Sequence, residues 1–217
     1  MRITIERRID DSTTERFLAL YREAFAPLET VAAARQSLTD DEFREEMSDP
    51  SVLKFVGWNR RGESVALMMV ATDLDVVPWI SAPFYRAQFP EQAARGAIYY
   101  FGALLVAPGV RGGPWAHRLL GEGVRFVAGN VGIAAFDCCR YNVEEIDVPR
   151  MVAEIGERLC YFDRHEVDVQ RYYAYVSHGL KEVEIDLRDL PVVVETDEPP
   201  AAEDAVHAAS LRGGHPS

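Results

Sequence analysis

A glycine-rich segment that follows an apolar run is the part of this 217-residue chain best suited to chemistry. The segment reads VAPGVRGGPWAHRLL from Val106 to Leu120, directly after the apolar run that starts at Ile98. A strand that leads through a glycine-rich turn into a helix is a phosphate-binding device, because glycines let the backbone approach closely and the first helical amides are unpaired. Arg111 adds a fixed cation beside these amides. The segment therefore predicts a pyrophosphate site.

The composition places the chain among ordinary globular proteins, with 48% hydrophobic and 27% charged residues. A length of 217 residues suggests one domain, or one domain with an appendage. The longest apolar stretches are broken by Arg, Asp or Pro well before the ~20 residues that a membrane span needs, so no contact with a membrane is expected. The start, MRITIERRID, lacks the hydrophobic core of a signal peptide. These features predict a cytoplasmic protein.

The net charge of -12 argues against nucleic acid as a partner, because phosphate backbones are bound by basic patches. An acidic surface instead tolerates cationic partners, including amine substrates. The three cysteines, Cys138, Cys139 and Cys160, are odd in number and lack metal-ligand spacing. We therefore predict neither a disulfide framework nor a metal site.

The pattern of apolar residues and helix caps predicts alternating strands and helices around the glycine-rich segment. In chain order we expect a strand at 3–5, helices begun by Ser12 and Thr39, a hairpin at 52–58 and 64–72, a strand at 98–107, the helix after the glycine-rich turn, a strand at 132–139, a helix from Asp147 and two strands within 161–176. Residues 73–97 are expected to form a long aromatic loop, which either lines a pocket, makes a dimer contact or is pinned by its own hydrophobic cluster.

This order of elements, together with the loop motif, resembles the GCN5-related N-acetyltransferases (GNAT). The family pattern is V-x-P-x-x-R-x-x-G-x-G/A followed by paired leucines, and the residues in register here are Val106, Pro108, Arg111, Ala116, Leu119 and Leu120. The resemblance implies an α/β (α+β) fold, with a mixed, splayed sheet of about seven strands flanked by helices. It covers residues 1–180 as an acyl-CoA-binding domain, with an extra strand or arm at 181–195 and a disordered tail at 196–217.

The resemblance also implies a cofactor, acetyl-CoA or another acyl-CoA, and roles for matching positions. Backbone groups of Leu104, Leu105 and Val106 are expected to hydrogen-bond the pantetheine arm and to orient the thioester carbonyl. The pyrophosphate is expected at the amides of the loop, namely Arg111, Gly112, Gly113, Trp115 and Ala116. Asn142 matches a position that faces the cofactor in the family, and a plain turn role is the alternative for it.

Two departures from the family pattern concern cofactor binding and catalysis. Pro114 stands where the family has a glycine whose amide contacts the pyrophosphate, and proline has no N–H. Register places Glu157 where the family has its tyrosine acid, while Tyr161 lies four residues further on and substitutes for it only if the helix continues. Tyr100 stands where some members have a glutamate base, and a tyrosine with an ordinary pKa of ~10 is a poor base at neutral pH. The base is therefore water or lies elsewhere.

Three functions remain open at this point. The first is an N-acyltransferase that moves an acyl group from acyl-CoA to an amine of a small molecule or peptide by direct attack. The second is a GNAT-fold domain that binds a ligand or partner without turnover. The third is a long-chain N-acyltransferase that uses acyl-CoA or an acyl carrier protein. The acceptor stays unassigned, and so does the oligomeric state, for which a homodimer is one option.

Overall fold

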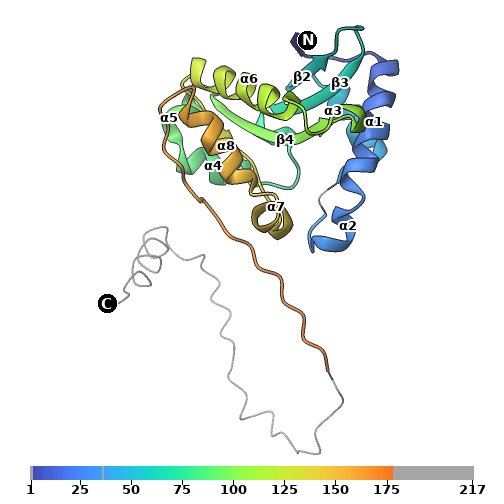
Figure 1. Ribbon diagram of the computed structural model, residues 1–217. Helices are drawn as coiled ribbons and strands as arrows, with labels where there is room; N and C mark the ends of the chain where they lie inside the picture. The colour runs from blue at the N-terminus through green and yellow to red at the C-terminus, as the bar shows by residue number, and fades with distance from the viewer. Residues whose placement is uncertain (1, 36, 178–217) are drawn as a thin grey trace, which may run out of the picture. The chain divides into compact units, whose positions relative to one another are not determined.

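The computed structural model describes residues 2–35 and 37–177, and the chain separates into one unit that ends at Tyr172 and a second that begins at Tyr173. The first unit is built on one mixed sheet in the order β1-β2-β3-β4-β5 (Figure 1). The strands are β1(Arg2–Glu6), β2(Val52–Trp58), β3(Ser64–Ala71), β4(Ile98–Val106) and β5(Ile133–Ala135). The first four strands pair antiparallel, and β5 joins β4 in parallel. The predicted α/β class is confirmed.

The sheet has five strands in the described part of the chain, rather than about seven. The two strands expected within 161–176 are absent, although the segment has strand-like alternation, as in Val167, Val169 and Tyr173. A strand needs a neighbouring ladder for its backbone groups, and no such pairing is formed by residues 161–177. The extra strand or arm expected at 181–195 and the tail expected at 196–217 lie outside the described residues.

Helices cover both faces of the sheet (Figure 1). One face packs against α1(Asp11–Phe25) and α3(Asp40–Ser48), through Phe17, Tyr21 and Phe43, while α2(Leu28–Val31) links these two helices. The other face packs against α6(Trp115–Gly129) and α8(Val148–Glu157), chiefly through Trp115 and Leu119. The apolar residues that recur at helical spacing thus form the buried face of each of these helices. Within the described residues, no helix is long and apolar enough to cross a membrane.

Side-chain caps fix where the first helices begin. At α3 the predicted capping box is confirmed, because the Glu42 amide donates to Thr39 Oγ1 and the Glu42 carboxylate accepts from the Thr39 amide. At α1 the expected cap is wrong. The cap is Asp10, whose carboxylate accepts from the Thr13 amide, and the Ser12 hydroxyl donates to the same carboxylate. An aspartate two residues earlier therefore outcompetes the serine.

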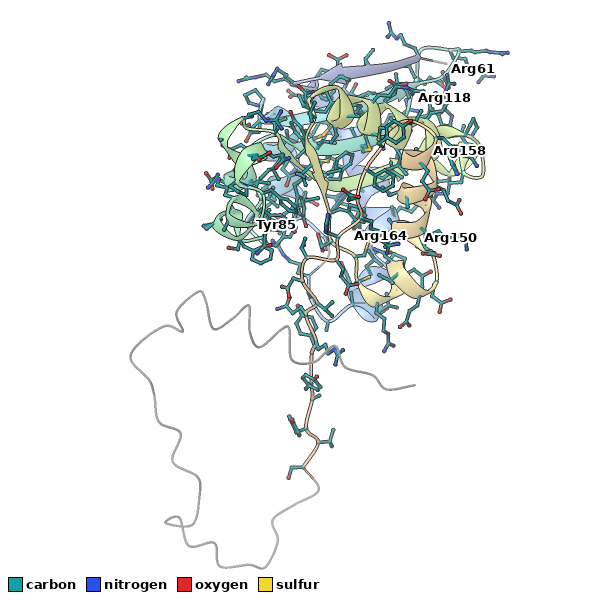
Figure 2. The ribbon with its side chains drawn as sticks, turned by 90° about the vertical axis from the view of Figure 1, so that its left-hand side faces the viewer. Arg61, Tyr85, Arg118, Arg150, Arg158 and Arg164 are labelled. Atoms are coloured by element: carbon teal, nitrogen blue, oxygen red, sulfur yellow. The ribbon has the colours of Figure 1, made fainter. Side chains whose placement is uncertain are left out.

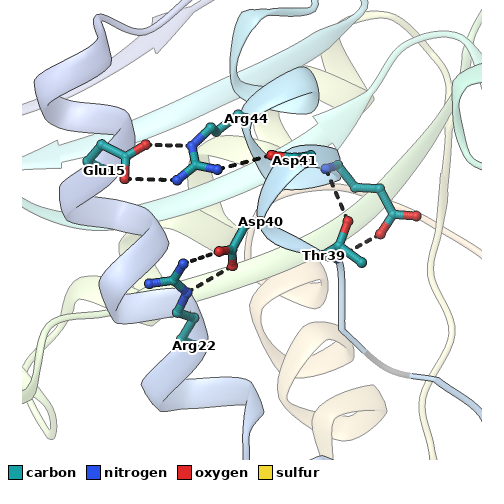
Figure 3. A network of polar contacts seen from close by, with 7 residues as sticks. Glu15, Arg22, Thr39, Asp40, Asp41 and Arg44 are labelled. Atoms are coloured by element: carbon teal, nitrogen blue, oxygen red, sulfur yellow. Dashed lines mark hydrogen bonds and ion pairs between the residues drawn. The ribbon is translucent and has the colours of Figure 1, made fainter.

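Ion pairs tie α3 to α1 (Figure 3). Arg44 Nε lies 2.6 Å from Glu15 Oε1, and the Arg22 guanidinium pairs with the Asp40 carboxylate. All four side chains are partly exposed, so each pair contributes only ~0–1 kcal/mol. The position of α3 over the sheet is therefore set mainly by the buried side chains of Phe43 and Met47.

The long loop expected at 73–97 contains short helices instead: η1(Leu74–Val76), α4(Ala82–Gln88) and α5(Pro90–Ala94). Ser81 caps α4 by accepting from the Phe84 amide, and Pro90 opens α5. Figure 2 shows Tyr85 of α4 far from Arg150 of α8 in that view. Tyr85 and Phe89 pack against the core on the sheet face that α1 and α3 cover.

Candidate functional site

The edge of β4 that faces β5 is open over most of its length. The β4–β5 register covers only residues 98–100 of β4, because β5 has three residues rather than the eight predicted for it. The β3–β4 register shifts at Gly102, which is a bulge that increases the local twist. Residues 101–106 of β4 therefore pair with β3 alone.

Two residues of this open stretch turn their backbone groups away from β3. The Ala107 amide donates to Val65 O at 2.9 Å, and backbone direction alternates along an antiparallel ladder. Leu105 consequently faces β3, while Leu104 and Val106 face the open edge. The expected backbone role thus fits Leu104 and Val106, whereas Leu105 uses its backbone groups in the ladder and buries its side chain.

The glycine-rich loop forms η2(Pro108–Val110) and a turn that ends at α6. The turn uses two of the amides expected to bind the pyrophosphate, because Arg111 N donates to Pro108 O and Gly113 N donates to Val110 O. Gly112 takes a φ of +78°, a conformation that favours glycine. Its amide remains the loop's candidate donor.

The first turn of α6 supplies further donors. Its first intrahelical hydrogen bond runs from Arg118 N to Pro114 O, so the amides at 115–117 precede the helical ladder. Pro114 occupies the N-cap, where its missing N–H costs the helix nothing. The Trp115 side chain is buried and would touch a Cβ at Gly57 at 2.8 Å. Trp115 therefore anchors the helix start with its ring and leaves only its amide for a ligand.

Arg111 lies between the loop and α1. Its Nε donates to Val106 O at 3.3 Å, and its Nη2 lies 3.3 Å from Glu23 Oε1. These contacts hold the guanidinium beside the open edge of β4. A phosphate there would compete with Glu23 for the cation, and the pair with Glu23 is exposed and weak.

Tyr100 is the last residue of β4 that pairs with β5. It is buried, and its hydroxyl donates to the Asp137 carboxylate, which is exposed just beyond β5. Burial and the neighbouring Asp137 charge raise the pKa of Tyr100 well above its ordinary value. A phenol in this setting stays protonated, so the structure argues against Tyr100 as a base.

The other expected residues are spread around this edge. Asn142 lies half-buried in α7(Arg140–Glu144), which follows β5. The helix α8 ends at Glu157, so it does not continue to Tyr161, whose side chain is fully exposed. Cys138 directly follows Asp137, and burial raises the pKa of its thiol to about 11. The thiol therefore stays protonated and is a poor nucleophile at neutral pH.

Glu46 lines a pocket beside the bulge of β4 although no motif marks it. It lies on α3 between the buried residues Phe43 and Met47, at the border of the helix's inner face. It lines a pocket with Trp79, Tyr100 and Gly102, on the sheet face covered by α1 and α3. Burial raises the pKa of Glu46 to about 7. The only sequence signal was its helical position, three residues after Phe43.

No protein-family model and no curated protein matches the sequence. Solved structures do resemble the fold. An aminoglycoside acetyltransferase from an uncultured soil metagenomic sample, in complex with sisomicin, is 13% identical with a TM-score of 0.45 over 81% of this chain and 97% of that one. AAC(6')-Iy, in complex with a CoA-based bisubstrate analogue, is 14% identical with a TM-score of 0.46 over 82% and 100%.

A ribosomal-protein-alanine N-acetyltransferase from Brucella melitensis is 13% identical, with a TM-score of 0.45 over 79% of this chain and 100% of that one. All three structures are acetyltransferases, the class of enzyme that the Val106–Leu120 motif resembles. At these identities and TM-scores the likeness carries no argument about activity. The function of this chain has to be inferred from its own residues.

Proposed function

We propose that this protein is an acyl-CoA-dependent N-acyltransferase that moves an acyl group to a primary amine by direct attack. The observation that carries the proposal is the continuity of the open β4 edge with the loop and with the unpaired amides of α6. An extended amide chain that ends in a pyrophosphate fits such a track, because a strand edge binds extended amides and a helix start binds phosphate.

The donor contacts follow from backbone direction. Leu104 and Val106 offer their backbone groups to the pantetheine amides and to the thioester carbonyl. The amides of Gly112, Trp115 and Ala116 face the pyrophosphate, and Arg111 adds its charge. Donors fixed in this way stabilise the negative charge that develops on the carbonyl oxygen during attack.

Direct transfer is supported by the absence of an activated nucleophile among the described groups of the site. The Cys138 thiol and the Tyr100 phenol both have raised pKa values, so neither is ionised at neutral pH. An acyl-enzyme route through either group would first require its ionisation, which these pKa shifts disfavour. We therefore assign the attack to the amine of the acceptor.

Calorimetric titration with acetyl-CoA tests the donor site. We expect saturable binding, and we expect the Arg111→Ala variant to bind about tenfold more weakly, because a charge-assisted hydrogen bond contributes ~1.5–3 kcal/mol. Arg125→Ala is the matched control, since Arg125 lies further along α6 and pairs with Glu122. Its affinity should match that of the wild type.

Two results would count against this proposal. Absence of heat at millimolar acetyl-CoA would remove the donor site altogether. Binding without release of free thiol, across alkylamines, arylalkylamines, polyamines and peptide α-amines, would instead favour a binding domain on the same fold. One observation supports this second function. The amides of Arg111 and Gly113 are already hydrogen-bonded within the turn, and Pro114 has no amide hydrogen, so fewer donors remain for a pyrophosphate.

A further inference from the structure

A small pocket opens on the sheet face opposite α6, beside the bulge of β4. Its lining combines Glu46 of α3 with Trp79, Tyr100 and Gly102, and is completed by the apolar residues Val52, Met69, Ala71, Val76 and Val77. Its free volume is about 10 Å³, which is space for one water-sized group. An ammonium group is of that size.

The Glu46 carboxylate has no counter-charge bound to it. Within the described residues, it makes no hydrogen bond and no ion pair. The nearest influence of opposite sign is Lys54 of β2, but the Lys54 ammonium donates to Arg7 O at 3.1 Å and to Asp49 O at 2.7 Å. Lys54 is thus engaged with backbone carbonyls. The acid remains open to a cation from outside.

The aromatic walls favour the same kind of ligand. The rings of Trp79 and Tyr100 lie edge to face with centroids 6.4 Å apart, and Tyr85 approaches Tyr100 in the same way at 6.2 Å. Ring faces attract cations through their quadrupole, most strongly for tryptophan. A lining that joins one acidic residue to two aromatic residues around a water-sized space therefore favours an ammonium over a neutral group.

The pocket also touches the strand that carries the donor site. Gly102 belongs both to its wall and to the stretch of β4 that lies beyond the β5 pairing. A Cβ built on Gly102 would meet nothing within 4 Å, so the backbone there is accessible. An amine bound near Gly102 lies along the strand from Leu104, which faces the open edge.

We propose that Glu46 binds the acceptor's ammonium group in this pocket and takes one of its protons before attack. This inference rests on the proposed function. The ammonium gives a proton to the carboxylate and becomes a neutral amine. Its nitrogen lone pair forms the bond to the thioester carbon, the carbon–sulfur bond breaks, and the thiolate leaves with the bonding electrons. The thiolate takes the second proton from the nitrogen, and Glu46 later releases its proton to water.

The titration of Glu46 suits this role. Burial raises its pKa to about 7; Lys54 opposes this shift, while Glu42 and Asp49 add to it. Tyr100, which faces the same pocket, stays neutral because its pKa is raised too. A base with a pKa near the working pH combines ionisation with driving force for proton transfer.

An NMR chemical-shift titration with n-propylammonium chloride at pH 8 tests the site without turnover. We expect saturable shifts at the Gly102 amide and the Trp79 indole, and none with n-propanol, its neutral analogue. Glu46→Gln should weaken binding about tenfold or more. The matched control is Glu45→Gln, because Glu45 is the exposed neighbour on the same helix, and it should bind as the wild type does. For the wild type, lowering the pH to 6 should weaken binding about tenfold, because most Glu46 carboxyls are then protonated.

Any of three results would overturn the inference: no binding by the wild type, equal affinity in Glu46→Gln, or equal binding of n-propanol. The change with pH keeps the test valid if Glu46→Gln does not fold. The same samples are titrated with acetyl-CoA. Unchanged acetyl-CoA binding with no amine binding would refute only the role of Glu46, whereas failure to bind acetyl-CoA would refute the proposed function.

Discussion

Glu46 carries a cost in stability that follows from the direction of its pKa shift. Its pKa rises from 4.5 to about 7 on folding, so the folded state holds this proton more tightly than the unfolded state does. The resulting stability is complete below pH 4.5 and is lost as the pH rises through 7. At pH 8 the unpaired Glu46 carboxylate therefore lowers the free energy of unfolding.

Removing this charge should stabilise the protein at alkaline pH. We expect Glu46→Gln to raise the free energy of unfolding at pH 8 by about 1–3 kcal/mol, and this gain should shrink toward pH 4.5. Urea unfolding at several pH values measures it, with Glu45→Gln as the reference. Parallel pH profiles for the wild type and Glu46→Gln would show that the carboxylate is not strained in the fold.

Several candidate site residues came from the resemblance of the glycine-rich motif to a family pattern. Arg111, Gly112 and Ala116 are candidates of this kind. Glu46 is not one of them, since a glutamate on a short amphipathic helix is usually solvated, and only its packing beside Trp79 and Tyr100 distinguishes it. The hydrogen bond from Tyr100 to Asp137 joins residues 37 positions apart, which no local pattern encodes.

At the scale of elements, the start of α6 is held by a contact with β2. Gly57 leaves room for the Trp115 ring, because a Cβ there would come within 2.8 Å of two ring carbons. The amides that precede the helical ladder sit on this anchored turn. The precision of the loop therefore depends on a glycine that lies 58 residues before Trp115 in the chain.

Filling this space should disturb the donor site as well as the core. We expect Gly57→Ala to destabilise the protein by about 1–3 kcal/mol, because overpacking a tight contact shifts the ring. Acetyl-CoA should also bind several-fold more weakly, since the α6 amides move with the ring. Gly129→Ala, at the open end of the same helix, is the control and should lower neither stability nor affinity. Thermal unfolding measures the change in stability, and calorimetry measures the change in affinity. Normal affinity for acetyl-CoA in a destabilised Gly57→Ala variant would show that the packing of Trp115 does not position the donor amides.

Element types were predictable where periodicity was strong and local caps agreed with it. The hairpin of β2 and β3 and the helices α3 and α8 follow from apolar spacing, capping and proline position. The strands expected within 161–176 failed, because alternation describes a strand's faces and not the partner that its backbone requires. The short β5 likewise depends on where β4 offers a pairing edge.

At the scale of the whole molecule, the two halves of the proposed reaction lie along one strand. β4 carries the open edge for the donor, and its bulge borders the pocket assigned to the acceptor. The net charge of -12 complements a cationic acceptor, since an acidic surface raises the local concentration of amines. The central claim is that coenzyme A binds along β4 and the start of α6.

Amide-resolved NMR of the whole chain during titration with coenzyme A tests this claim most directly. We expect saturable shifts concentrated at the amides of Leu104, Val106 and Gly112, and at residues 115–117. Only small changes should appear on β1 and on the far end of α6. Saturable binding with these amides unmoved, or shifts centred on another face of the sheet, would contradict it.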